Sequence, residues 1–197
     1  GGNYEVSLVT AMGTITPASV NVVGVSAASK VYDGTRLASL NGGGIEVFGS
    51  DSVTLLKAGA TGTFDSKDAG VAKSVAASGY ALSGADAGNY SLIQPFGLMA
   101  DITPKALSVV AKNDARTYDS TAYSGGNGVT YIGFVAGESQ AMLAGILSYG
   151  GTSQGAVNVG TYTLQPKGLA ARNYSLSLES GQLSLEKWQL IQVVLQM

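Results

Sequence analysis

Two short stretches pair a tyrosine with an aspartate and are the first candidates for a chemical site. Tyr32 and Asp33 stand in "KVYDGT", and Tyr118 and Asp119 stand 86 positions later in "RTYDST". Each carboxylate offers a metal ligand or an acid. Asp followed by Gly between extended segments is, however, a strong signal for a tight turn. We therefore interpret both stretches as turns, with the tyrosines as core aromatics whose hydroxyls reach backbone groups.

A glycine-rich loop, "GADAGNY", places Asp86 and Asn89 close together. Oxygen-rich loops of this kind can bind calcium. The corresponding stretch "GLAARNY" lacks the aspartate, which argues against a repeated ion site, and neither the EF-hand nor the nonapeptide calcium pattern is present. Calcium stays an alternative, and we expect no other cofactor and no metal ligands.

A second pair of carboxylates, Asp65 and Asp68 in "TFDSKDAG", has the residue types of a glycoside hydrolase. The two stand three residues apart with Lys67 between them, which is more typical of a solvated turn. We predict no catalytic residues here.

Composition excludes several other kinds of site. The 197 residues include no Cys and no His, which removes disulfides, thiol catalysis and the Ser-His-Asp arrangement. The net charge is −2 and no basic cluster is present, so nucleic acid is not an expected partner. No apolar run reaches the length of a membrane span, and we expect no membrane insertion. The chain is predicted not to be an enzyme.

The candidate motifs recur in a fixed order, which predicts a repeat. "GNY" or "RNY" centres on Asn3, Asn89 and Asn173, and "ITP" begins at Ile15 and at Ile102. The spacings lie between 84 and 87 residues and agree with the spacing of the Tyr-Asp turns. The Tyr-Asp stretch therefore reads as a register mark of a repeated domain.

These marks divide the chain into four segments. Residues 1–14 are predicted to be the terminal hairpin of a preceding repeat, and 15–102 and 103–186 to be two repeat domains. Residues 187–197 are an apolar tail or the first strand of a further unit. Pro104 suits the boundary because proline cannot continue a central strand.

Alternating apolar residues and frequent turn residues predict a mainly β fold. "ALSVVA", "SVTLL", "TYTLQP", "NYSLSLES" and "GQLSLE" each place apolar residues at every second position. Only Glu138 to Leu147 has helical spacing, with Met142, Leu143 and Ile146 on one side. We predict two tandem small β domains in an elongated array, with at most one short helix in the second.

The last ten residues, "WQLIQVVLQM", are unusually apolar. With Leu185 aligned on Ile15 and Ile102, this stretch falls where the first strand of a third unit would begin. Its Gln spacing also fits a helix with a narrow polar stripe. In either form it is expected to bury against its own unit or another chain.

Aromatic residues of the second repeat are the candidate ligand contacts. Tyr123, Tyr131, Phe134 and Tyr149 cluster in sequence and offer rings for stacking on sugar. This predicts, as an alternative function, a binding face for a carbohydrate or a matrix polymer.

The combined motifs resemble known repeats over residues 15–186. "ITPKALSVVA", "RTYDSTAYSGGNGVTYIGFVAGE" and "LSYGGTSQGAVNVGTYTLQPKGLAARNYSL" are similar to the MBG-type repeat of large bacterial surface adhesins. "KVYDGTRLASL" and "GYALSGADAGNYSL" resemble its partner, the YDG repeat. The chain departs from the pattern at Ser120 and at Glu186–Lys187.

The resemblance implies a function that the residues alone do not. It points to filamentous-haemagglutinin-like adhesins exported by two-partner secretion to the surface of Gram-negative bacteria. It implies Ig-like or β-grasp-like domains in a stalk, a role in attachment or biofilm cohesion, and no catalytic residues. The expected partners are neighbouring repeats and a host or matrix glycan or protein, with self-association through edge strands or the tail as a further alternative.

Overall fold

The structure, a computed structural model, describes residues 2–7 and 10–188, and these form two compact units. The first unit contains the described residues up to Ala28, then Leu37–Phe64 and Ser74–Met99. The second contains Ser29–Arg36, Asp65–Lys73 and the described residues from Ala100 onward. Three segments of the first sequence repeat, 29–36, 65–73 and 100–102, thus belong to the second compact unit. The boundary between the two sequence repeats, placed after residue 102, therefore stays a prediction.

The first unit is made of short strands and one 3₁₀ turn. Its elements are β1 (Ala18–Asn21), β2 (Val23–Ala27), β4 (Leu37–Ala38), β5 (Leu40–Gly44), β6 (Thr54–Leu56), β7 (Thr61–Phe64), β9 (Ala81–Ser83), η1 (Ala87–Asn89) and β10 (Tyr90–Ile93). Two further strands, β8 (Gly70–Ser78) and β11 (Leu98–Thr103), contribute residues to both units.

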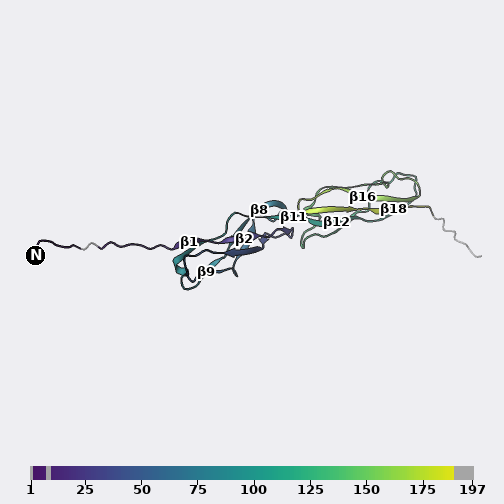
Figure 1. Cartoon of the computed structure of the whole chain (residues 1–197). Coiled ribbons are helices and arrows are strands. Elements are labelled where there is room, and N and C mark those ends of the chain that lie inside the picture. The colour runs from purple at the N-terminus through teal and green to yellow at the C-terminus, as the bar shows by residue number, and fades with distance from the viewer. Residues whose placement is uncertain (1, 8–9, 189–197) are drawn as a thin grey trace, which may run out of the picture. The chain divides into compact units, whose positions relative to one another are not determined.

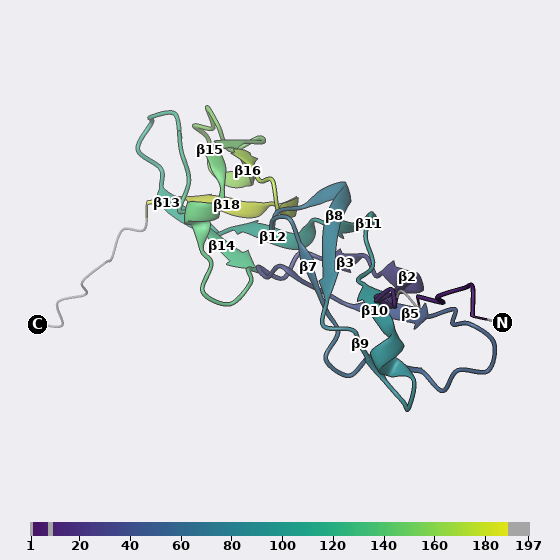
Figure 2. The same cartoon turned by 90° about the vertical axis from the view of Figure 1, so that its left-hand side faces the viewer.

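Pairing in the first unit is mostly antiparallel. β2 pairs with β5, and Figure 2 shows these two strands next to each other. β4 pairs with β7 and β6 with β9, also antiparallel, whereas β1 runs parallel to β10. Because side chains alternate across a strand, buried residues recur at every second position, as in the pattern of β7. The core of this unit includes Val20, Phe64, Tyr80 and Tyr90.

The second unit contains the longer strands. Its elements are β3 (Lys30–Val31), β12 (Lys105–Ala111), β13 (Asp114–Thr117), β14 (Val129–Ile132), η2 (Gln140–Met142), β15 (Ala144–Gly150), β16 (Gly160–Ala170), β17 (Tyr174–Glu179) and β18 (Gly181–Glu186). The five alternating stretches picked out by their sequence pattern all contain strands, so the mainly β prediction is confirmed.

Two sheets form the body of the second unit. One has the order β14-β12-β17 and the other β13-β18-β16-β15. β12 lies against β16 and β18 of the other sheet, and Figure 1 shows the three strands alongside one another. Leu107, Leu164 and Leu183 are fully buried. Each sheet includes one parallel pair, which the antiparallel sheets of an immunoglobulin domain lack.

Matching strand registers reveal the repeat in three dimensions. Ala18 of β1 lies opposite Tyr90 of β10, and Lys105 of β12 lies opposite Tyr174 of β17. Likewise β11 runs parallel to β3, with Ile102 opposite Lys30. β18 runs parallel to β13 in the same way, with Leu185 opposite Arg116. The alignment of Leu185 with Ile102 in sequence therefore corresponds to one structural position.

The helical interpretation of residues 138–147 is wrong. Only Gln140–Met142 forms a 3₁₀ turn, and β15 begins at Ala144. The reason is a close approach of two backbones: a Cβ built on Gly145 would lie 2.1 Å from the Gly168 carbonyl oxygen of β16. Strand pairing with β16 thus overrides the helical spacing, and Ile146 is 84% exposed.

The two ends of the chain are described only in part. Residues 2–7 and 10–17 contain no strand, so their role as the last hairpin of a preceding repeat stays a prediction. In the tail, Trp188 is exposed, and the predicted strand or helix otherwise lies outside the described residues. Within the described part of the chain, no helix is long and apolar enough to cross a membrane.

Candidate functional site

The first Tyr-Asp stretch is a tight turn held by its own side chains. Asp33 Oδ1 accepts hydrogen bonds from the Thr35 backbone N–H at 2.9 Å and from the Thr35 hydroxyl at 2.8 Å. Lys30 Nζ lies 2.8 Å from the same oxygen. Gly34 has φ +77°, a conformation that glycine adopts without a steric cost. The turn interpretation is confirmed.

The second stretch repeats the same geometry with different residues. Asp119 Oδ1 accepts from the Thr121 N–H at 2.9 Å and from its hydroxyl at 2.8 Å, and Arg116 pairs with Oδ2. Ser120 takes the glycine position with φ +59°. The hydrogen bonds from Thr121, followed by that from Arg116, lower the pKa of Asp119 to about 2. Both aspartates therefore serve the turn as fixed carboxylates.

The tyrosines before these aspartates differ in their surroundings. The backbone N–H of Tyr32 donates to the Thr103 carbonyl at 2.8 Å, and that of Tyr118 donates to the Glu186 carbonyl at 2.8 Å. Tyr32 is 1% exposed, whereas Tyr118 is 40% exposed. Tyr32 is a core aromatic as predicted, whereas the same prediction for Tyr118 is wrong. The Tyr32 hydroxyl donates to the Glu138 carboxylate at 2.6 Å, so the expected backbone partner is wrong.

Glu138 is the centre of a buried polar cluster in the second unit. Its Oε1 accepts from Tyr32, its Oε2 accepts from the Tyr174 hydroxyl, and Lys67 Nζ lies 3.6 Å from Oε1. Burial acts to raise the pKa of this carboxyl, but the hydrogen bonds from Tyr174 and Tyr32 and the charge of Lys67 outweigh it. The pKa of Glu138 therefore lies below its ordinary value. Burial and the bond to Glu138 raise the pKa of Tyr32 to about 12.

The Tyr174 hydroxyl is held by both ends of one turn. It accepts from the Val135 N–H at 3.0 Å and donates to Glu138, three residues further on. The turn closes with a 2.9 Å hydrogen bond from the Glu138 N–H to the Val135 carbonyl. The ring of Tyr174 meets Tyr32 and Phe134 edge to face, at centroid distances of 5.5 and 5.2 Å. We call this arrangement the tyrosine–acid turn.

A second tyrosine–acid turn occurs in the first unit. The Tyr90 hydroxyl accepts from the Phe48 N–H at 2.9 Å and donates to Asp51 Oδ2 at 2.7 Å. Asp51 again follows three residues after the donor, and its N–H donates to the Phe48 carbonyl at 3.2 Å. The device thus belongs to the repeat, since Tyr90 and Tyr174 are the tyrosines of the second and third "NY" marks.

The asparagine of the third "NY" mark has its own partners. Asn173 is 6% exposed, donates to Asp68 Oδ1 at 3.0 Å and accepts from the Ala69 N–H at 2.9 Å. Arg172 Nη1 lies 3.3 Å from Asp68 Oδ2. Asp65 instead pairs with Lys73 at 2.6 Å. The two carboxylates therefore serve separate structural pairs.

The loop considered for calcium is closed by its own hydrogen bonds. Asp86 Oδ2 accepts from the Ser52 N–H at 2.7 Å, and the Asn89 N–H donates to the Asp86 carbonyl at 3.0 Å. Among the residues that the structure describes, no group of three or more His, Cys, Asp or Glu side chains could hold a metal ion.

The four candidate ligand-contact aromatics separate into two pairs. Tyr123 is 5% exposed in a core cluster, Tyr149 packs against that cluster, and the Tyr123 hydroxyl donates to Asp114 at 2.7 Å. Tyr131 and Phe134 form a half-buried pair with centroids 5.6 Å apart. Their role in ligand binding stays a prediction.

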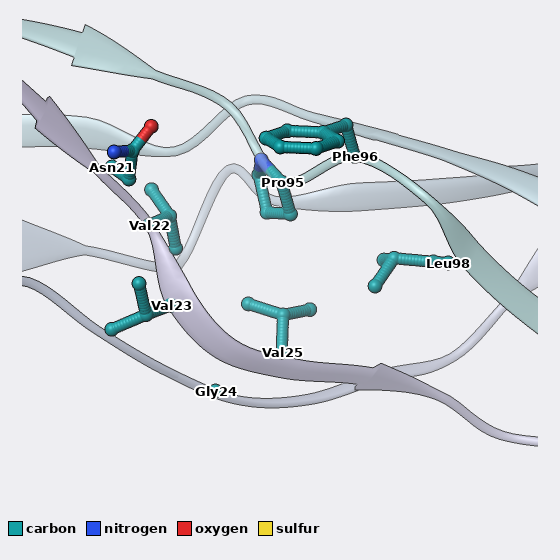
Figure 3. A pocket seen from close by; sticks show the side chains of 8 residues that line it. All are labelled: Asn21, Val22, Val23, Gly24, Val25, Pro95, Phe96 and Leu98. Carbon is teal, nitrogen blue, oxygen red and sulfur yellow. The ribbon is translucent and has the colours of Figure 1, made fainter.

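A hollow in the first unit has a volume of about 370 Å³. Its wall consists of Asn21, Val22, Val23, Gly24, Val25, Pro95, Phe96 and Leu98. Figure 3 shows that the side chains are apolar except for Asn21. It offers an apolar surface without acid, base or nucleophile.

Sequence reasoning did not single out Glu138 and Asn173, whose side chains make hydrogen bonds across more than 30 positions of sequence. Asn173 was visible as part of the "NY" mark. Glu138 had a weaker signal, an acidic residue three positions after Val135, which matches Asp51 after Phe48.

The comparisons with known proteins agree with the two structural repeats. No curated protein and no solved structure matches the chain. Family models match in two places, the YDG domain over residues 16–96 and the MBG domain of the YGX type over residues 107–184. The chain therefore contains a YDG domain followed by an MBG domain.

Proposed function

We propose that the chain is a non-enzymatic repeat segment of a secreted bacterial surface adhesin that serves attachment or biofilm cohesion. The observation that carries this proposal is the shared frame of the two domains. The same Asp-centred turn and the same tyrosine–acid turn occur twice, with matched strand registers. A frame copied in this way suits a modular spacer better than a single reaction site.

The use of the polar residues supports the same proposal. The carboxylates of Asp33, Asp119, Glu138, Asp51 and Asp68 all accept hydrogen bonds from neighbouring backbone or side-chain groups. Carboxylates held in this way are poorly suited to transferring protons to a substrate. The resemblance to filamentous-haemagglutinin-like proteins adds export by two-partner secretion and a place on the surface of a Gram-negative cell.

Surface labelling of the bacterium that encodes the chain tests this proposal. Antibodies raised against the purified chain should bind intact cells, and deletion of the segment should reduce attachment in a static biofilm assay. Replacing the segment with two unrelated β domains of similar length should restore attachment if it acts as a spacer. Labelling that requires permeabilised cells would refute the proposed location.

A second candidate, binding of a carbohydrate or matrix polymer, rests on the half-buried pair Tyr131 and Phe134. A glycan array probed with the chain should then give signals that Tyr131→Ala abolishes. Tyr80→Phe, a change in the core of the first unit, is the control and should leave the signals unchanged. An array without signals above background excludes this candidate.

A further inference from the structure

We propose that a second copy of this chain binds head to tail, with the Tyr118 turn of one copy contacting the tyrosine–acid turn at Asp51 of the next. In this contact the Tyr118 hydroxyl donates a hydrogen bond to Asp51. The inference does not depend on where the protein resides, so it can fail while the proposed function stands.

The template for this contact is present inside the second unit. There the first Asp-centred turn places Tyr32 so that its hydroxyl donates to Glu138 at 2.6 Å and its ring meets Tyr174 edge to face. The turn thus joins a tyrosine–acid turn that stands 106 positions away in the sequence. Burial of Tyr32 to 1% shows that the two fit closely.

Tyr118 presents the same group in the same setting, but its side chain is exposed. The 116–121 turn matches the 30–35 turn in its aspartate and threonine bonds, its basic residue and its strand register. The Tyr118 side chain is 40% exposed. Among the described residues, its hydroxyl makes no hydrogen bond. We call this turn the donor end.

Asp51 presents the matching acceptor. Glu138 uses one carboxylate oxygen for Tyr174 and the other for Tyr32. Asp51 uses Oδ2 for Tyr90, and within the described part of the chain its Oδ1 accepts no hydrogen bond. Phe48 stacks on Tyr90 with ring centroids 6.2 Å apart and is 69% exposed, so its ring is accessible to a second copy. Asp51, Tyr90 and Phe48 are the acceptor end.

A second contact of the template also has exposed counterparts. Asn173 accepts from the Ala69 N–H, and Ala69 immediately precedes β8. Val159, 43% exposed, precedes β16 in the same way. The counterpart of Asn173 is the exposed Asn89, which lines a hollow of about 150 Å³ with Ile15, Thr16, Pro17 and Gly88. The Val159 segment of one copy therefore fits the Asn89 hollow of the next.

The geometry determines the kind of assembly. Donor and acceptor ends are different surfaces, so the contact is heterologous and each copy can bind one partner at each end. Such contacts produce open chains unless the rotation closes a ring. The expected behaviour is a mass that keeps rising with concentration beyond the dimer.

Sedimentation equilibrium of the full chain from micromolar to about 1 mM tests the proposal. Tyr118→Phe and Asp51→Asn should each weaken association roughly 10- to 100-fold, as expected for losing a hydrogen bond to a charged group. Tyr131→Phe removes a hydroxyl that makes no hydrogen bond among the described residues, and it should behave like the parent chain. Circular dichroism spectra of all variants should coincide, which separates a lost contact from a lost fold.

A mixture of the two variants tests whether the contact joins the donor end of one copy to the acceptor end of another. Tyr118→Phe retains an intact acceptor end and Asp51→Asn retains an intact donor end. An equimolar mixture should therefore form dimers with parental affinity, yet no larger species. A chain that stays monomeric up to 1 mM overturns the proposal, and so does association that neither substitution weakens, which would point to the tail or an edge strand instead.

Discussion

Replacing Glu138 by alanine should destabilise the second unit by about 3 kcal/mol. The substitution leaves two buried hydroxyls without their acceptor, since Tyr32 and Tyr174 are 1% and 3% exposed. A buried polar group without a partner costs roughly 1–3 kcal/mol, and Tyr174 retains the Val135 N–H as a donor but has no acceptor for its own hydrogen. Removing the charge of a side chain that is only 11% exposed recovers part of this cost.

Hydrogen exchange of backbone amides is the suitable assay, because two units need not unfold in one transition. Amides of β12 and β17 in Glu138→Ala should exchange with a free energy of opening lower by about 3 kcal/mol, roughly a 150-fold faster exchange. Asp51→Ala is the matched control. It removes the equivalent carboxylate but frees one hydroxyl, that of Tyr90, so the loss should be about 1–2 kcal/mol and confined to the first unit.

A double-mutant cycle identifies the partner. Tyr32→Phe combined with Glu138→Ala should show a coupling of about 1–2 kcal/mol, because both changes remove one hydrogen bond. A change in the free energy of opening of less than about 0.5 kcal/mol in Glu138→Ala would contradict the prediction. It would mean that water replaces the carboxylate and that the cluster adds little to the stability of the second unit. A coupling of zero would also refute the assigned contact.

Four further changes test other parts of the structure. Ser120→Gly should stabilise the protein by about 0.5–1 kcal/mol in urea denaturation, because φ +59° strains serine, and an unchanged midpoint would contradict this. The free energy of unfolding should fall as the pH drops from about 4 towards 2. The ionised Asp119 stabilises the folded protein fully above the pKa of the unfolded chain, and this stabilisation is lost as the pH falls to its lowered folded-state pKa of about 2. Asp119→Asn should flatten that dependence in acid titrations followed by circular dichroism. In alkali, Tyr32 and Tyr123 have pKa values raised to about 12. Their contribution to the free energy of unfolding is therefore complete below pH 10 and is lost as the pH rises towards 12. Absorbance at 295 nm should show tyrosines, these two among them, that ionise well above pH 10, and one simple transition near pH 10 would argue against their burial. Gly42→Ala should destabilise β5 by more than about 1 kcal/mol, because its Cβ would lie 2.2 Å from the Gly24 carbonyl oxygen, and thermal denaturation measures the loss.

Local patterns predicted the Asp-centred turns well. Lys30, Asp33 and Thr35 lie within six positions, so their hydrogen bonds need only a short stretch of backbone. The alternating runs of β12 and β18 likewise predict strands, because burial on one face requires apolar residues at every second position. The repeat spacing then extended this reasoning from one domain to the other.

Local sequence patterns gave a wrong secondary-structure prediction where pairing with another strand determines the conformation. The spacing of Met142, Leu143 and Ile146 suits a helix, but Gly145 meets Gly168 of β16 at backbone distance, and the segment becomes a strand. The information for that outcome lies in β16, more than twenty residues further along the chain.

The sequence by itself determined the repeat, the turns that mark it and the mainly β character, since each is visible in short local motifs or in their recurrence along the chain. Only the tertiary structure decided which groups those marks contact. Tyr32 meets Glu138 across 106 positions, and Asn173 meets Asp68 across 105. Such partners are chosen by packing of whole strands and not by local preference, which is why Tyr32 and Tyr118 look alike in sequence and differ so much in burial.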